Sequence, residues 1–258
     1  MTRPPLPPLA AVAAEQVRAV CLALRPLIVV LGPLAVLVTL VAWGRALYEG
    51  RGLAVTPGVA PLVALAALPL PALVWRDEFQ SRRPYLATLP VGRTRHTLLK
   101  ATAGWAWLMV VVGAFVGWLL VGALVTGGSV GVGATGGPGA PAWAWGVPFT
   151  AATLAYAVGT VAVLAGGRTR LWLAGIAGVV FFLLVFSDEA VSPSWTAEVA
   201  PLLLEGRFGL ETVLTGSPVW AAEHGARPGF SRWSAATVLW VGSALAAVVG
   251  VAGRDRRS

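Results

Sequence analysis

The stretch ATAGWAWLMVVVGAFVGWLLVGALVT, residues 101–126, contains no charged residue, and the chain stays free of charge as far as Gly167. A transmembrane helix needs about 20 mostly apolar residues, because each residue advances it by about 1.5 Å across roughly 30 Å of hydrocarbon. We therefore expect one span at 101–126 and a second at 147–167. The sequence between them, GGSVGVGATGGPGAP, is too rich in glycine to form a helix exposed to lipid.

Charge-free stretches elsewhere in the chain predict four more spans, at about 26–46, 53–75, 171–187 and 233–253. The third of these is short, but the arginines that precede it can extend their charged ends to the membrane surface. Of all residues, 57% are hydrophobic and 12% are charged, about half the charged share of a soluble domain. The sequence therefore predicts an all-α polytopic membrane protein whose six transmembrane helices form a single domain, 1–258.

The basic residues predict the orientation, because loops on the cytosolic side of a membrane carry an excess of Lys and Arg. With the N-terminus in the cytosol, most of the 19 Lys and Arg residues fall on that side, and acidic residues outnumber basic ones outside. We therefore expect both termini in the cytosol of a bacterium and the protein in its cytoplasmic membrane, with no nucleic-acid partner. Tryptophans typical of interfacial belts flank the spans: Trp43, Trp75, Trp105, Trp107, Trp143, Trp145, Trp172 and Trp233.

Two segments outside the spans are expected to be helical. Residues 9–25 place apolar side chains on one side and charges on the other, which predicts a cytosolic interfacial helix; the alternative is that they extend the first span. Leu22, on the charged side, fits this pattern worst. Residues 188–232 are too charged to span but contain leucines at helical spacing, which predicts short exoplasmic or re-entrant helices rather than a disordered loop.

The sequence lacks the residues of common catalytic and metal sites. It contains neither HExxH nor GxSxG nor a phosphate-binding GxxxxGK[ST], and its one cysteine, Cys21, cannot form a disulfide within the chain. The two histidines, His96 and His224, have no ligand-type neighbours at metal-binding spacing. No ionisable group is expected at bilayer depth, which disfavours an ion-coupled carrier. We expect neither an enzyme nor a cofactor-binding protein.

Small and mildly polar residues mark particular faces of the predicted spans. The pair Gly113 and Gly117, and a repeat of small residues at 242, 246 and 250, suit close helix contact, within one subunit or across a dimer. In the fourth span Thr153, Tyr156 and Thr160 share one face. This stripe fits either interhelical hydrogen bonding or the lining of a substrate path. Four prolines predict a kink in the second span.

The sequence between the second and third spans, RDEFQSRRPYLATLPVGRTRHTLLK at 76–100, is the longest cytosolic connection predicted. A basic loop that only sets topology is one interpretation. The loop also resembles the corresponding segment of ABC-2 type transporter permeases. The resemblance rests on an acidic Glu78, the leucine-containing helix Tyr85–Leu89, the Pro-Val-small-Arg turn at 90–93 and Lys100 entering the third span. Gly92 departs from the serine that this family often has.

The resemblance implies a permease subunit that pairs with a second permease, as a homodimer or heterodimer, and docks two separate ATP-binding subunits that hydrolyse ATP. The loop would then form a coupling helix that contacts the ATPase. The resemblance assigns this contact to Asp77, Glu78, Arg82, Arg83, Tyr85, Leu86 and Leu89. Charge-free spans favour export of an apolar or amphipathic substrate such as a lipid, peptide or drug. The alternative is a non-transporting membrane scaffold or assembly factor whose basic loop binds lipid.

Overall fold

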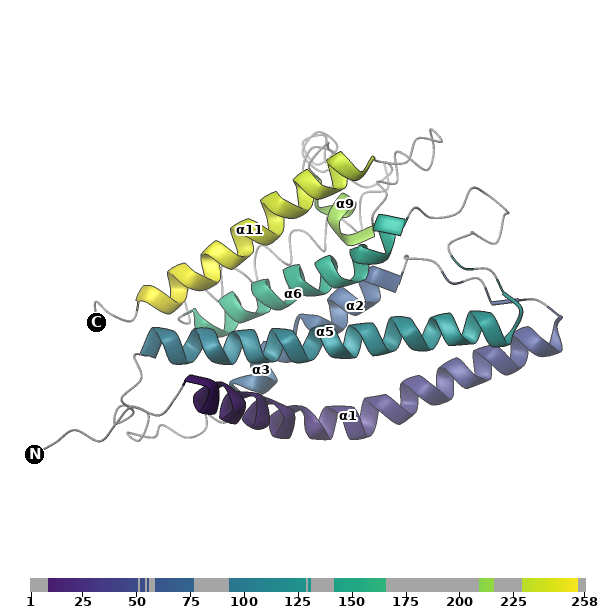
Figure 1. The fold of residues 1–258 in the computed structure, drawn as a ribbon, viewed down its shortest axis with the longest axis horizontal. Helices are drawn as coiled ribbons and strands as arrows, with labels where there is room; N and C mark the ends of the chain where they lie inside the picture. Colours follow the sequence, from purple (N-terminus) through teal and green to yellow (C-terminus); the bar gives the residue numbers. More distant parts are fainter. Residues whose placement is uncertain are drawn as a thin grey trace, which may run out of the picture. The chain divides into compact units, whose positions relative to one another are not determined.

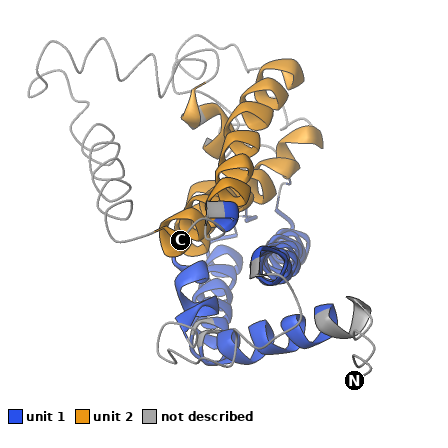
Figure 2. Ribbon diagram, turned by 90° about the vertical axis from the view of Figure 1, so that its left-hand side faces the viewer, with its two compact units in different colours: residues 1–56, 69–139, 252–258 blue, residues 57–68, 140–251 orange. Residues whose placement is uncertain are grey.

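The computed structural model describes residues 9–50, 52–53, 55, 59–76, 93–128, 130, 142–165, 209–215 and 229–254. The chain divides into two compact units, one of residues 1–56, 69–139 and 252–258 and the other of residues 57–68 and 140–251 (Figure 2). Each unit is built from helices. In chain order these are α1 (Leu9–Tyr48), α2 (Ala60–Ala67), α3 (Leu70–Val74), α5 (Arg93–Val125), η3 (Ala142–Gly146), α6 (Val147–Leu164), α9 (Leu210–Thr215) and α11 (Phe230–Arg254) (Figure 1).

The described residues include four segments long and apolar enough to cross a membrane. These segments are Ile28–Tyr48, Thr94–Val125, Ala142–Leu164 and Phe230–Gly253. Each of them overlaps one of the apolar stretches expected to span, while the number of spans and their identity stay predictions. The expected span at 171–187 lies outside the described residues. The described part of the chain is thus predominantly helical, as expected, and the apolar helices are compatible with a multi-pass membrane protein.

The second span expected at 53–75 is seen in part as an apolar helical segment, and the kink that its prolines predict is present. The chain forms two short helices, α2 and α3, separated by a turn at Leu68–Pro69, and together they cover only Ala60–Val74. Fifteen residues at about 1.5 Å each fall short of roughly 30 Å of hydrocarbon. The break follows from proline, which lacks an N–H group and is tolerated in the first turn of a helix but not in its interior. Pro61 occupies the first turn of α2, and Pro71 that of α3.

In the first unit, α1 is one helix of 40 residues that contains Pro26 and Pro33. The interfacial helix and first span, expected as separate elements, are therefore continuous, and the ribbon bends along α1 (Figure 1). Proline removes a backbone hydrogen bond within a helix and commonly bends it. The apolar side of residues 9–25 is covered in part by the protein, since Val20 and Leu24 are each only 1% exposed and α1 contacts both α3 and α5, whereas Val17 on the same side is 45% exposed.

The contact between α1 and α5 is built on two tryptophans. The rings of Trp43 and Trp118 stack with centroids 4.6 Å apart. Trp118 Nε1 donates a hydrogen bond to Thr39 Oγ1 at 2.8 Å, and this hydroxyl in turn bonds to backbone carbonyls of its own helix. Gly122 leaves the space that the Trp43 ring fills, because a Cβ there would overlap the ring. The seam between α1 and α5 therefore depends on two stacked tryptophan rings and on a glycine that leaves room for one of them.

The chain beyond this seam is pinned at the C-terminal end of α5. Leu53 N donates a hydrogen bond to Thr126 Oγ1 at 2.9 Å, and Val55 forms an isolated parallel bridge with Val130. At Gly128 any side chain would collide with the Leu53 backbone, so glycine permits this close crossing. The segment that follows α1 therefore returns across the end of α5 in a defined register.

The second unit is centred on α6, which contacts α2, α9 and η3. Its core contains Ala60, Ala64, Val147, Ala151 and Trp233. Trp233, at the start of α11, also lies 5.2 Å from Trp143 of η3 between ring centroids. Helix α9 lies within the 188–232 segment, where short helices are expected, and its Val213 is fully buried. A short helix that contacts α2 and α6 supports the prediction over an unstructured loop.

Candidate functional site

The residues expected to contact an ATPase, 77–89, lie outside the described residues. The structure does describe both ends of their loop. The chain enters it through Trp75 and Arg76, directly after α3, and leaves it at Arg93, where α5 begins. Helix α5 continues without a break from Arg93 to Val125, so the loop leads directly into this apolar helix.

The two ends of the loop are held together by an aromatic ring and a buried cation. Lys100 Nζ lies 5.8 Å from the centroid of the Trp75 ring, within the range of a cation–π interaction. Both side chains are buried, Trp75 at 3% and Lys100 at 7% exposure. Burying an ammonium group costs free energy unless other groups compensate its charge. The Trp75 ring supplies part of this compensation to Lys100. The last turn of α3 and the second turn of α5 are thus fixed to each other.

A second contact ties the same end of α5 to α1. The Gln16 side-chain amide and the His96 imidazole are joined by a hydrogen bond, Nε2 to Nε2, of 3.0 Å. We call Gln16, Trp75, His96 and Lys100 the stem cluster, because they join α1, α3 and α5 at the base of the loop. Of its members only Lys100 belongs to the motif read from the sequence. The sequence marks Trp75 only as an interfacial tryptophan, and it contains no signal that pairs Gln16 with His96, which are 80 positions apart.

The polar stripe of α6 lies in the interior of the second unit. Tyr156 is 4% exposed and Thr160 1%, and Thr160 Oγ1 donates to the Tyr156 carbonyl at 2.8 Å. Thr153 Oγ1, which is half-buried, donates to the Phe149 carbonyl at 2.7 Å. Both threonine hydroxyls are therefore bonded to the backbone of their own helix, which lets them sit in apolar surroundings. Their contact with a substrate stays a prediction.

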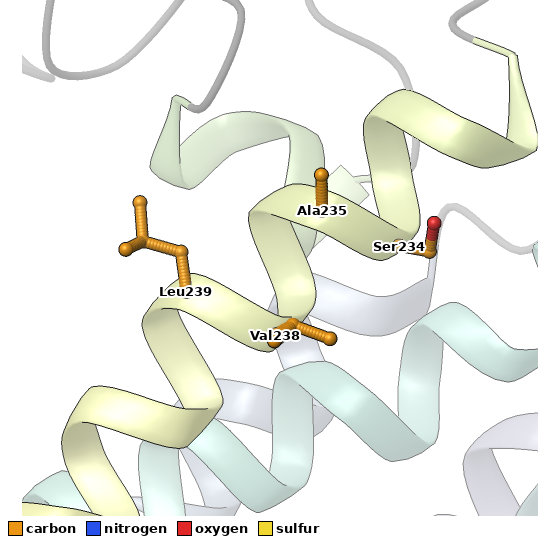
Figure 3. A pocket seen from close by; sticks show the side chains of 4 residues that line it. All are labelled: Ser234, Ala235, Val238 and Leu239. Carbon is orange, nitrogen blue, oxygen red and sulfur yellow. The ribbon is translucent and has the colours of Figure 1, made fainter.

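An open apolar hollow of about 560 Å³ lies along α11. Its lining includes Ser234, Ala235, Val238 and Leu239, which succeed one another along the helix (Figure 3). Further along α11, the small residues at 242, 246 and 250 are exposed, and a Cβ at Gly242 or Gly250 would meet nothing within 4 Å. Within the described part of the chain, this stripe therefore packs against no other helix.

The described helices define a class of protein, one with several membrane-length apolar helices and a polar cluster at the base of a charged loop. In this part of the chain no three His, Cys, Asp or Glu residues gather as they would around a metal ion. No protein-family model matches the chain, and neither a curated protein nor a solved structure matches it. Its function is therefore argued from its own residues.

Proposed function

We propose that this protein is the transmembrane permease subunit of an ATP-binding cassette transporter of the ABC-2 type. It exports an apolar or amphipathic substrate, and ATP hydrolysis in two separate subunits drives the transport. A second permease, identical or related, completes the complex. The stem cluster carries the proposal, because it joins both ends of the charged 77–92 loop to helices that continue into membrane-length segments.

A loop joined in this way can transmit a displacement to the membrane helices. Helices are stiff along their axes, and packed side chains between them carry motion only if they form contiguous contacts. Gln16 belongs to the same continuous helix as the candidate span Ile28–Tyr48, and His96 to the same helix as the span Thr94–Val125. A pull on the loop would therefore act on both spans together. This is the behaviour needed from a helix that couples nucleotide hydrolysis to transport.

The proposed substrate class follows from the chemistry of the spans. Lys and Arg residues are confined to the ends of the four candidate spans, so a strongly charged substrate would find no counter-charge at their centres. The α11 hollow is predominantly apolar in its lining, which suits an acyl chain or another greasy group. Hydroxyl groups at Thr153, Tyr156 and Thr160 would supply the polar part of the path.

Co-purification tests the proposal directly. The protein, carrying an affinity tag and extracted from its host in mild detergent, is expected to bring down an ATPase that contains a phosphate-binding loop. Mass spectrometry of the eluate identifies this partner, and a second tagged membrane protein of similar size controls for unspecific capture. Repeated isolation without any such ATPase, under conditions that preserve known membrane complexes, would contradict the proposal.

The proposed orientation makes a separate prediction. In a Cys21→Ala background, a cysteine introduced by Arg82→Cys should resist a membrane-impermeant maleimide in intact spheroplasts and react after permeabilisation. A cysteine from Arg51→Cys, in the first predicted outside loop, should react in both states and serves as the matched control. The physical reason is the excess of basic residues in the 76–100 loop, which holds it on the cytosolic side. Labelling of position 82 in intact spheroplasts would place the loop outside, where it could not contact a cytosolic ATPase.

A further inference from the structure

The exposed face of α1 between residues 18 and 25 combines two arginines with a leucine. At about 100° per residue, Arg18, Leu22 and Arg25 share one side of the helix, opposite Val20 and Leu24. The structure bears out this division: the latter pair is buried, both arginines are exposed, and Leu22 is 59% exposed. The leucine that fits the amphipathic pattern worst therefore lies in the open between two cations.

Neither arginine forms an ion pair with an acidic residue that the structure describes; the pair found there is Arg45 with Glu49, near the other end of the helix. Glu15 lies on the same face as Arg18. Because this one acidic residue stands against two arginines, the face keeps a net positive charge. A single exposed leucine is common on protein surfaces and carries no argument by itself. Its position between two arginines and next to the candidate span fits a membrane surface, where the apolar side chain enters the lipid while the arginine heads reach the phosphates.

The position of this face along α1 agrees with a membrane interface. The candidate span begins at Ile28, three residues after Arg25, which corresponds to about 4.5 Å along the helix axis. The same helix face continues into the span at Val29, which is 63% exposed. Arg25 therefore lies at the depth of the lipid headgroups if Ile28–Tyr48 crosses the membrane.

We propose that Arg18, Leu22 and Arg25 form a binding site for an anionic phospholipid in the leaflet where α1 enters the membrane. The two guanidinium groups hold the lipid phosphate, and Leu22 contacts the upper part of an acyl chain. Arginine suits this role because its planar fork can donate two hydrogen bonds to one phosphate. The net positive charge of the face favours an anionic lipid over a zwitterionic one, whose own cation would compete with the arginines.

Lipid titration with native mass spectrometry tests the site in the detergent-purified protein. The wild-type chain is expected to bind phosphatidylglycerol more tightly than phosphatidylcholine, with a preference that falls as salt rises. The double variant Arg18→Gln/Arg25→Gln should bind phosphatidylglycerol roughly 25-fold more weakly, from about fivefold for each arginine, and phosphatidylcholine nearly as before. Leu22→Gln should weaken binding of both lipids.

The matched control is Arg45→Gln, which removes an exposed arginine from the same helix but from an existing ion pair. It is expected to leave the phosphatidylglycerol affinity unchanged. Tryptophan fluorescence melting of each variant in phosphatidylcholine verifies that the fold is retained. Unchanged phosphatidylglycerol binding by the folded double variant would overturn the site. The site would also be overturned if the double variant lost a co-purified partner protein but kept its lipid binding, because the face would then contact a protein. The lipid measurement requires neither an ATPase nor transport, so its outcome is independent of the proposed function.

Discussion

Gly122→Ala is expected to lower the free energy of unfolding by about 2 kcal/mol, because the new methyl group would overlap the Trp43 ring. That ring cannot move aside cheaply, since it is 8% exposed and stacked on Trp118 at 4.6 Å. Relief would require separating α1 from α5 or breaking the hydrogen bond from Trp118 to Thr39. Unfolding in mixed micelles of rising sodium dodecyl sulfate, followed by tryptophan emission, measures the change.

Gly117→Ala provides the matched control in the same helix. A Cβ at Gly117 would meet nothing within 4 Å, so alanine there should leave stability unchanged or raise it by about 0.5–1 kcal/mol through its better helix propensity. Both substitutions add one methyl group to α5, and only one of them faces a tryptophan. Equal stabilities of the two variants would show that Trp43 does not occupy the space above Gly122.

Hydropathy predicts the long apolar helices well because membrane-length helices need nothing more than an uninterrupted apolar stretch. The same criterion misses the turn within 53–75, where the apolar run is long enough but its prolines divide the helix at Leu68–Pro69. Hydropathy does not register where backbone donors are missing. The prolines themselves do predict a kink there, and the structure has a turn at Leu68–Pro69 between two short helices.

Amphipathic pattern finds the helix at 9–25 but not what its faces contact. Apolar side chains such as Val20 and Leu24 suit a membrane surface as well as a protein interior. Periodicity alone does not distinguish these two environments. Pro26 suggests an end to the helix, yet α1 passes through it as one bent element. The exposed position of Leu22, an exception in the sequence pattern, becomes informative only once the opposite face is known to be buried.

Contacts within the candidate site are the part that the sequence predicts least. Trp118 and Thr39 are 79 positions apart, and their hydrogen bond depends on how two separate helices pack. The same holds for the stem cluster, in which only Lys100 stands out as a lone lysine at a helix entrance. A single sequence contains no signal that pairs residues across helices. Short motifs can therefore suggest a role for the loop. The residues that hold the base of the loop are identified only from the folded structure.

The loop itself makes the prediction with the largest functional effect. Glu78→Gln or Leu89→Ala is expected to reduce ATP-stimulated transport by about tenfold or more, because each removes a side chain assigned to the contact with the ATPase. Neither residue lies in a predicted span, so insertion into the membrane should be normal. The measurement is ATP-dependent movement of a fluorescent lipid analogue in inverted vesicles that contain the protein and its co-purified ATPase.

Glu49→Gln is the matched control, since it neutralises a carboxylate outside the loop whose partner is the exposed Arg45. It should transport as the unmodified protein does. A scaffold or assembly factor would behave differently: neither loop variant would change ATP-dependent transport, because no force would pass through the loop. If a loop variant loses transport while the ATPase still binds, the substitution affects coupling and not docking. The motion of the bound ATPase would then fail to reach the stem cluster, which joins α1, α3 and α5 at the base of the loop.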